Sequence, residues 1–309
     1  MDILGQQLIN GLVLGSIYAL VALGYTMVYG ILELINFAHG EVTMLGAMIG
    51  IAVIDAMLAS TTGVPGLAVL AAGLAASIAV CMGIGFSLER VAYRPLRQAP
   101  RLAALITAIG MSIVLQNVAM LIWGKQYINF PPVVTLVKYH VGAATVTNLQ
   151  IAVVLLSCLL MMGLLALVRY TSLGRAMRAT AQSTETAGLM GINVNRVISA
   201  TFVIGASLAA VAGVMNAAYY GIAHYTMGFT LGLKAFAAAV LGGIGNIPGA
   251  MLGGLLLGLI ESLGAGYLGQ LTGGFLGSHY QDVIAFFVLI LVLVLRPSGL
   301  LGERVGERA

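Results

Sequence analysis

Polar side chains with acid–base and hydrogen-bonding capacity gather in one short segment of an apolar region, residues 36–43. If this segment is helical, Asn36, His39 and Thr43 stand at i, i+3 and i+7 and share one face. Glu41 points away from that face, so one continuous helix cannot aim all four side chains at one ligand, whereas a break at Gly40 could. Polar groups in apolar surroundings usually line a bundle interior or a water-filled path. The segment therefore predicts a substrate path or gate, with interhelical packing as the alternative.

A second segment, 169–196, combines four arginines with small and polar residues. Residues 179–190 are predicted to form a short helix, in which Ser183 or Thr184 caps a final turn and Gly191 ends the helix in a left-handed conformation. The apolar residues near the end of this helix are unusual on a solvated loop. They predict a docking element, and the alternative is a connector that rests on lipid headgroups.

A third segment, 241–249, interrupts an apolar stretch with glycine, asparagine and proline. Paired breaks of this kind can place helix ends near a substrate at the membrane midplane, and a tight turn between two spans fits equally well. Glu261 lies seven residues after Gly254, on the glycine face of the following helix. We expect Glu261 to be buried against protein rather than lipid.

These polar groups stand out because the chain of 309 residues is 60% hydrophobic and only 8% charged. Soluble domains are about 25% charged, so the composition excludes a soluble enzyme, a nucleic-acid binder and a disordered scaffold. It predicts an all-α polytopic membrane protein, a bundle of about 8–9 transmembrane helices with broken or re-entrant segments. Glycines four residues apart, such as Gly11 and Gly15 or Gly254 and Gly258, allow helices to approach closely in lipid.

Nine stretches are long and apolar enough to cross a bilayer core, which takes roughly 20 residues per helix. They are 8–30, 38–58, 66–87, 102–122, 149–168, 197–220, 228–245, 249–267 and 280–295. The seventh stretch is short and contains Lys234. The region around 30–41 is either a simple loop or a re-entrant break.

The arginines indicate the orientation of these spans. All eleven lie in three stretches, 90–101, 169–196 and 296–308, as the positive-inside rule predicts for cytoplasmic loops. Nine crossings place all three stretches in the cytoplasm and the N-terminus outside. Eight crossings would separate the last stretch from the other two unless one segment is re-entrant. We therefore expect nine crossings and a cytoplasmic C-terminus.

The sequence contains no recognisable motif for catalysis or nucleotide binding. It lacks the Gly-x-x-x-x-Gly-Lys-Ser/Thr phosphate loop, so the chain has no visible means of binding ATP for itself. His-Glu-x-x-His and Gly-x-Ser-x-Gly are also absent, and the four histidines lack the spacing of metal ligands. We expect no catalytic residue, no metal site and no cofactor in this chain.

Several blocks of sequence carry a family resemblance. A glycine-rich first span, 11–30, is followed by Ile35-Asn-Phe-Ala-His-Gly-Glu41, Glu89-Arg-Val-Ala-Tyr-Arg-Pro-Leu-Arg97, Gly174-Arg-Ala-Met-Arg-Ala179 and Ala237-Ala-Ala-Val-Leu-Gly-Gly-Ile-Gly-Asn-Ile-Pro-Gly249. In this order the blocks resemble the branched-chain amino acid ABC-transporter permeases, of the LivH type, over nearly the whole chain. Permeases for urea and short amides are similar as well, so the resemblance leaves the substrate class open.

The resemblance implies that 1–309 is a single transmembrane permease domain in a bacterial inner membrane. In importers of this kind a homologous second permease subunit completes the path. Two cytoplasmic ATPase subunits bind ATP and Mg and supply the energy, and a periplasmic binding protein delivers the substrate. The absence of a phosphate loop then follows, because hydrolysis takes place on a partner chain.

The loop 169–196 resembles the coupling segment of this family, in which a short helix sits in a cleft of the ATPase. Many importers have Glu-Ala-Ala followed by glycine three residues later, and the corresponding register here reads Glu185-Thr-Ala-Gly188. The coupling residues that the resemblance implies are Gly174, Arg175, Arg178, Glu185, Gly188 and Gly191.

The leading interpretation is a permease subunit that moves leucine, isoleucine and valine inward. The same machine with urea or short amides as cargo is the first alternative. A stand-alone channel or secondary transporter is a further alternative, and it would conduct solute without ATP or partner chains.

Overall fold

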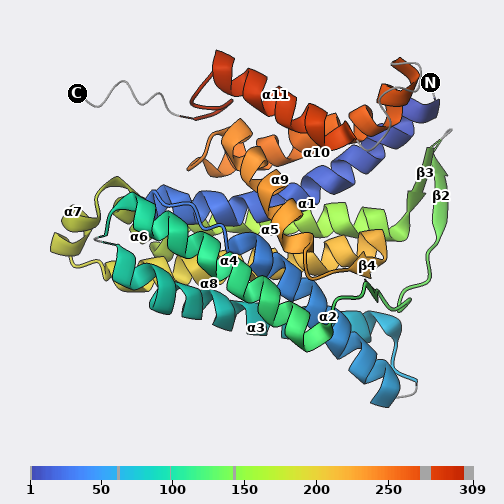
Figure 1. Ribbon diagram of the computed structural model, residues 1–309, viewed down its shortest axis with the longest axis horizontal. Coiled ribbons are helices and arrows are strands. Elements are labelled where there is room, and N and C mark those ends of the chain that lie inside the picture. Colours follow the sequence, from blue (N-terminus) through green and yellow to red (C-terminus); the bar gives the residue numbers. More distant parts are fainter. Residues whose placement is uncertain (1, 61–62, 98, 142–143, 272–279, 303–309) are drawn as a thin grey trace. The chain divides into compact units, whose positions relative to one another are not determined.

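The computed structural model describes residues 2–60, 63–97, 99–141, 144–271 and 280–302, and these are largely helical (Figure 1). The helices are α1 (Asp2–Leu32), α2 (His39–Ser60), α3 (Gly66–Leu88), the π-helical turn η1 (Glu89–Tyr93), the 3-10 turn η2 (Arg94–Leu96), α4 (Arg101–Trp123), α5 (Asn148–Tyr170), α6 (Ser172–Gln182), α7 (Thr184–Leu189), α8 (Val194–Tyr220), α9 (Met227–Gly242), α10 (Ile247–Leu271) and α11 (Gln281–Leu295). The predicted all-α class is confirmed.

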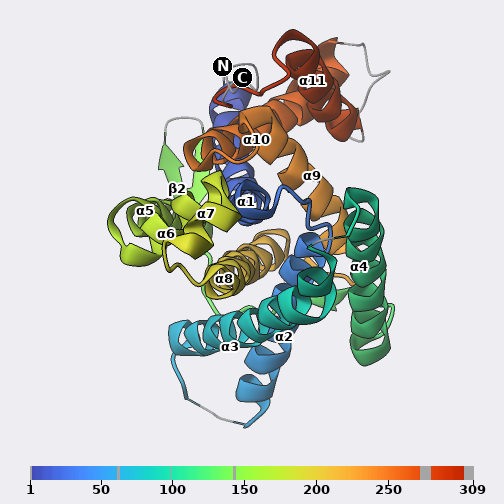
Figure 2. The ribbon, with the colours of Figure 1, turned by 90° about the vertical axis from the view of Figure 1, so that its left-hand side faces the viewer.

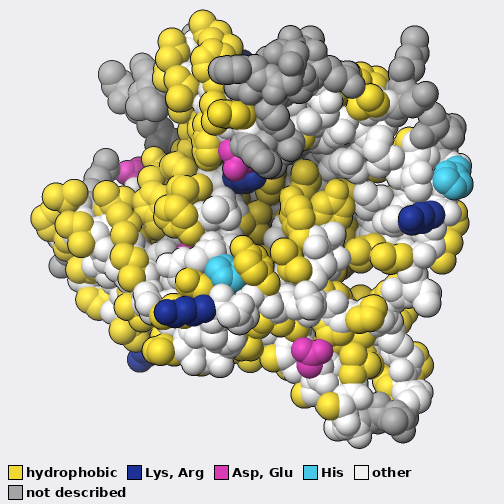
Figure 3. Space-filling view, turned by 45° about the vertical axis from the view of Figure 1, so that its right-hand side comes forward, with side chains coloured by type: hydrophobic (Ala, Val, Ile, Leu, Met, Phe, Trp, Pro, Cys, Tyr) yellow, Lys and Arg dark blue, Asp and Glu magenta, His cyan; other side chains and the backbone are white. Residues whose placement is uncertain are grey.

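Each of the nine predicted spans coincides with a helix. Within the described residues, seven helices are long and apolar enough to cross a membrane. The remaining two predicted spans overlap the shorter apolar helices Met227–Gly242 and Ala285–Leu295. The face in Figure 3 carries broad hydrophobic patches and few charged side chains.

The helices form two compact units, each assembled from separate parts of the sequence. Unit 1 comprises Met1–Thr26, Leu136–Met162 and Lys234–Ala309. Unit 2 comprises Met27–Thr135 and Gly163–Leu233. Because the boundaries fall inside α1, α5 and α9, each of these helices contributes to both units.

Unit 2 is built around α2, α3 and α8, which pack side by side (Figure 2). Small residues set their separation. A Cβ atom at Gly46 would lie 2.6 Å from the Cα of Ala210, and one at Gly85 would lie 2.6 Å from the Cβ of Ala206. Because glycine and alanine have little or no side chain, the helix backbones can approach closely. Close packing of this kind drives helix association in lipid.

In unit 1 the first part of α1 packs against α10 through the glycines that the sequence places four apart. A Cβ atom at Gly258 would lie 2.2 Å from the backbone nitrogen of Gly15, and one at Gly254 would lie 2.5 Å from the Cα of Ala19. A Cβ atom at Gly11 would lie 2.8 Å from the Cα of Leu259. The close contact that the glycine spacing predicts is confirmed.

The segment 241–249 forms a tight turn between two helices. Helix α9 ends at Gly242 and α10 begins at Ile247. The turn between them needs left-handed backbone at Gly243 (φ 108°) and Gly245 (φ 93°), conformations that glycine adopts without steric cost.

Two short antiparallel strand pairs occur in connections where the sequence predicts no regular structure. In unit 2, β1 (Ile128–Asn129) pairs with β4 (Ile222–Ala223). In unit 1, β2 (Lys138–Val141) and β3 (Ala144–Thr147) form a hairpin. Strands this short show almost no periodic pattern in the sequence, and the paired residues of β1 and β4 are 93 and 95 positions apart.

Candidate functional site

A break in the helices precedes the polar segment 36–43. Helix α1 ends at Leu32, and α2 begins only at His39. Between them Glu33 has a positive φ of 54°, which a residue with a side chain rarely adopts. Asn36 therefore lies outside the helix, and the predicted face shared by Asn36, His39 and Thr43 is wrong.

Asn36 is held by a tyrosine from the end of the α3 region. The hydroxyl of Tyr93, in η1, donates a hydrogen bond of 2.6 Å to Oδ1 of Asn36, and both residues are buried. The backbone of Asn36 in turn accepts from the amide of His39 at 3.0 Å. Asn36 thus fixes the start of α2 relative to η1.

Thr43 takes part in helix packing. Its hydroxyl donates to the carbonyl of His39 at 3.3 Å. Its own carbonyl lies against α8, where a Cβ atom at Gly213 would be only 2.0 Å away. Thr43 and His39 are both buried. For Thr43 the packing alternative describes these contacts better than a path lining.

Glu41 has the most unusual surroundings of the four predicted path residues. Its side chain is 1% exposed, and its Oε1 accepts from the hydroxyl of Ser112 at 3.1 Å. Among the described residues its Oε2 has no hydrogen-bond partner. This oxygen lies against the first turn of α9, where a Cβ atom at Gly228 would be 2.5 Å away. A buried carboxylate oxygen without a partner is costly, so Glu41 has more free hydrogen-bonding capacity than Asn36 or Thr43.

The segment 169–196 folds into two helices rather than one. Helix α6 ends at Gln182, and Ser183 caps α7 by accepting a hydrogen bond from the amide of Thr186 at 3.2 Å. The single helix predicted over 179–190 is therefore wrong, because the capping serine interrupts it. The predicted end is confirmed, since Gly191 has a φ of 82°.

The end of α7 presents an apolar surface. Leu189 and Met190 are 83% and 78% exposed, whereas Ala187 is buried. Glu185 lies in the exposed first turn of α7. Nothing lies within 4 Å of the position that a Cβ atom of Gly188 would occupy. Exposed apolar side chains beside open space are typical of a surface that contacts a partner.

The other predicted coupling residues divide into structural and exposed positions. A Cβ atom at Gly174 would lie 2.3 Å from the carbonyl oxygen of Val168, so Gly174 allows α6 to fold back on the end of α5. Arg178 donates a hydrogen bond to that same carbonyl. Arg175 is exposed and is available to a partner.

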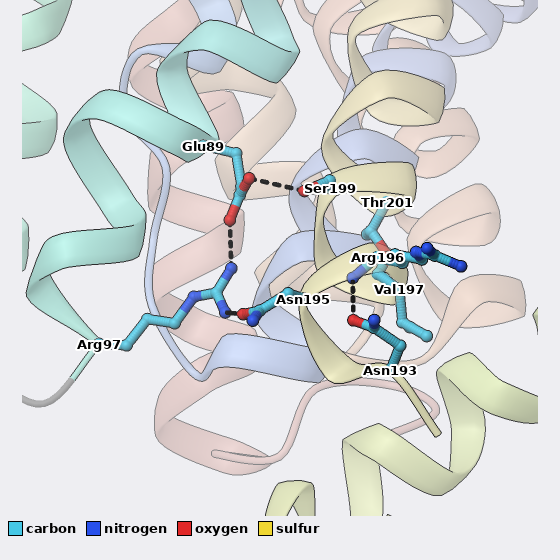
Figure 4. A network of polar contacts seen from close by, with 8 residues as sticks. All are labelled: Glu89, Arg97, Asn193, Asn195, Arg196, Val197, Ser199 and Thr201. Atoms are coloured by element: carbon cyan, nitrogen blue, oxygen red, sulfur yellow. Dashed lines mark hydrogen bonds and ion pairs between the residues drawn. The ribbon is translucent and has the colours of Figure 1, made fainter. Parts of the chain in front are cut away.

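A buried carboxylate, to which the sequence assigned no role, joins the α3–α4 connection to α8 (Figure 4). Glu89 is 0% exposed, and its Oε1 forms an ion pair with Arg97. Its Oε2 accepts from the hydroxyl of Ser199 at 2.7 Å. Arg97 also donates to Oδ1 of Asn195 at 2.6 Å. We call Glu89, Arg97, Asn195 and Ser199 the Glu89 cluster.

The electrostatics of the Glu89 cluster favour a persistent ion pair. Burial lowers the pKa of the Arg97 guanidinium from its usual value, and the neighbouring Glu89 charge opposes that shift. Arginine nevertheless stays protonated in proteins. A glutamate and an arginine at the end of an apolar span would have been a sequence signal for this pair. Nothing in the sequence marks Asn195 or Ser199 as their partners.

Unit 1 holds a second charge cluster, in which only Glu261 is fully buried. Lys234 of α9 forms ion pairs with Glu261 of α10 at 2.7 Å and with Asp282 of α11 at 2.8 Å. Oε2 of Glu261 accepts from the hydroxyl of Tyr18 at 2.9 Å. Glu261 is buried against protein, as predicted. The pairing explains how Lys234 can occupy an otherwise apolar helix.

Seven helices long and apolar enough to cross a membrane, within the described residues, define a multi-pass membrane protein. A family model described as "Branched-chain amino acid transport system / permease component" matches residues 7–293. The chain belongs to this family, and it is a multi-pass membrane permease rather than an enzyme. Membership implies ATPase and binding-protein partners.

Relatives in three organisms cover almost the whole chain. It is 47% identical over 308 residues to the high-affinity branched-chain amino acid transport system permease protein LivH of Escherichia coli (strain K12), covering 98% of this chain and 97% of the relative. It is 49% identical, with the same coverage, to the corresponding protein BraD of Pseudomonas aeruginosa. A probable branched-chain amino acid transport permease of Methanocaldococcus jannaschii is 27% identical over 97% of this chain and 93% of its own length.

Proposed function

We propose that the chain is the membrane-spanning permease subunit of a binding-protein-dependent ABC importer for leucine, isoleucine and valine. The observation that carries this proposal is the sequence identity of 47% and 49%, over nearly the full length of the chain, to two bacterial permeases of high-affinity branched-chain amino acid systems. Substrate moves inward, and ATP hydrolysis on partner subunits supplies the energy. The protein resides in a bacterial inner membrane with its C-terminus in the cytoplasm; Arg304, Arg308 and the C-terminus itself lie outside the described residues.

The proposed assembly contains two cytoplasmic ATPase subunits, a homologous second permease and a periplasmic binding protein. ATP and Mg are bound by the ATPase subunits, and none by this chain. The exposed end of α7 supports docking on an ATPase, because Leu189 and Met190 would be buried by a partner. Each fully buried side chain of this kind contributes roughly 1.5–3 kcal/mol, so the pair would form an effective anchor.

Within the substrate path we assign the principal contact to Glu41. The substrate is a zwitterion with an apolar side chain, so it needs an acceptor for its ammonium group and donors for its carboxylate. The unpartnered oxygen of Glu41 suits the ammonium group, and the nearby N-terminus of α9 at Met227 and Gly228 suits the carboxylate. Such a contact should be transient, because tight binding would hold the substrate in the membrane.

Purification in mild detergent, followed by reconstitution in liposomes, tests the proposal. We expect ATPase subunits and a second permease to co-purify, and labelled leucine uptake to require ATP and the binding protein. Unlabelled valine should compete with leucine and urea should not. Urea uptake by the same complex would instead support the urea or amide alternative. Solute flux through this chain alone, without ATP, would identify a channel or secondary transporter.

A further inference from the structure

A continuous series of contacts within unit 2 leads from the proposed ATPase-docking helix to the polar segment 36–43. It begins at the end of α7, where the amide of Ile192 donates to the carbonyl of Ala187 at 3.0 Å. Asn193 then caps α8 by accepting from the amide of Arg196 at 3.1 Å. Because only two residues separate the end of this turn from Asn195, a displacement of α7 acts directly on the first turn of α8.

The Glu89 cluster connects that first turn to η1. Arg97 joins Asn195 to Glu89, and Ser199, one turn further along α8, binds the second oxygen of the same carboxylate. Both oxygens of a fully buried carboxylate are thereby occupied (Figure 4). Removing either partner would leave a buried charge unsatisfied, which opposes any sliding of η1 against α8.

The other end of η1 contacts the polar segment 36–43. Tyr93 is the last residue of η1, and its hydroxyl binds Asn36, whose backbone holds the amide of His39. The ring of Tyr93 also packs on Phe202 of α8 with the ring centres 5.2 Å apart. Helix α8 therefore contacts both ends of η1, through Ser199 at Glu89 and through Phe202 at Tyr93.

The π-helical form of η1 makes these two contacts interdependent. Such turns are rare, occur mostly as single turns within helices, and are frequent at functional sites. A change of η1 to α-helical geometry would alter the angle between Glu89 and Tyr93. The contacts of both residues with α8 therefore hold the turn in its present form, and a shift of α8 would be passed on to Asn36.

We propose that Glu89 and Tyr93 are positioning residues that couple movement of the docking helix α7 to the path segment 36–43. The inference rests on the proposed function, because it assumes that an ATPase moves α7. It assigns a transport role to residues that touch neither the ATPase nor the substrate. Their loss should separate ATP hydrolysis from transport while the complex still assembles.

The test compares Glu89→Gln, Tyr93→Phe and the double variant in the reconstituted complex. Glu89→Gln keeps the shape of the side chain and removes its charge, and Tyr93→Phe keeps the ring on Phe202 and removes only the hydroxyl. Arg90→Gln is the matched control, since Arg90 belongs to the same turn and is exposed. The measured quantities are the amount of assembled complex and the number of ATP molecules hydrolysed per leucine taken up.

Each single variant should raise the ATP consumed per leucine about five-fold or more, the lower end of typical coupling effects, with normal assembly. Arg90→Gln should match the wild type. If the two residues act in series, the double variant should be no worse than the more severe single variant, because interacting positions are not additive. If Glu89→Gln fails to assemble, Tyr93→Phe decides alone.

The inference would be overturned if both single variants hydrolysed as many ATP molecules per leucine taken up as the wild type. So would effects that multiply in the double variant, because two independent packing defects add their free energies. Failure of the proposed function is distinguishable from either result. In that case the wild-type complex itself shows no leucine uptake that depends on ATP and the binding protein.

Discussion

The buried ion pair between Lys234 and Glu261 offers a quantitative test of the packing in unit 1. The Lys234→Met variant keeps most of the side-chain volume and removes the positive charge. Glu261, 1% exposed, would then retain only the hydrogen bond from Tyr18. Asp282 would also lose its partner; its side chain is 48% exposed, although the oxygen that contacts Lys234 is itself buried.

The size of the effect follows from these environments. Removing one partner of a buried ion pair leaves an uncompensated charge and costs about 3–5 kcal/mol. The contact with the half-exposed Asp282 side chain contributes at most about 1 kcal/mol. We therefore expect Lys234→Met to reduce stability by about 3–5 kcal/mol, nearly all of it through Glu261. For a chain of this size about 2–4 °C accompanies each kcal/mol, so the melting temperature should fall by at least ~6 °C.

The assay is thermal unfolding of the detergent-solubilised protein, followed by fluorescence-detected size exclusion. Lys138→Met is the matched control, because Lys138 is exposed on β2 of the same unit and its loss changes the net charge equally. The double variant Lys234→Met with Glu261→Gln should recover most of the loss, since a neutral glutamine still accepts the hydrogen bond from Tyr18. A single variant as stable as the Lys138 control, or a double variant less stable than Lys234→Met, would refute this reasoning.

Three further predictions concern docking, the path and helix packing. The Gly188→Trp variant should fold and insert normally, because the added side chain enters open space. It should nevertheless abolish both uptake and the ATP hydrolysis that the binding protein stimulates. Near-normal uptake would contradict the docking assignment. The Glu41→Gln variant should lower leucine uptake about ten-fold or more, as expected for the loss of a charge-assisted hydrogen bond of about 1.5–3 kcal/mol. The ATPase should still co-purify with this variant. Loss of assembly would instead support a packing role for Glu41. Gly258→Leu should destabilise unit 1 by at least about 1–3 kcal/mol through overpacking against Gly15, measured by thermal unfolding. Gly83→Leu, which has nothing within 4 Å, should not, and equal melting temperatures for the two would contradict the packing analysis.

The spans and the class of the protein were predictable because hydropathy is a local property of the chain. A helix in lipid must satisfy its backbone within its own segment, so each span can be recognised without its neighbours. The capping serine and the left-handed glycine of α7 are equally local. Ser183 and Gly191 act within a few residues of their own positions; Gly191 was predicted correctly, and Ser183 was one of the two predicted caps.

Errors arose where a local pattern was extended over a break. The face shared by Asn36, His39 and Thr43 requires a continuous helix, but α2 begins only at His39. The positive φ at Glu33 could not be read from its residue type, because a glutamate rarely adopts that conformation. The single helix over 179–190 failed for a similar reason, since a serine that can cap a helix can also interrupt one.

The sequence by itself determined the membrane class, the position of the spans and the family, and it predicted a docking role for the segment 169–196. The tertiary structure decided which charges meet. Tyr18 and Glu261 are 243 positions apart in the chain, and Glu89 and Ser199 are 110 apart. Such pairs form because a buried charge must find a partner wherever the fold brings one. Neither hydropathy nor residue spacing predicts which partner a buried charge has, because the partner depends on which helix faces pack together.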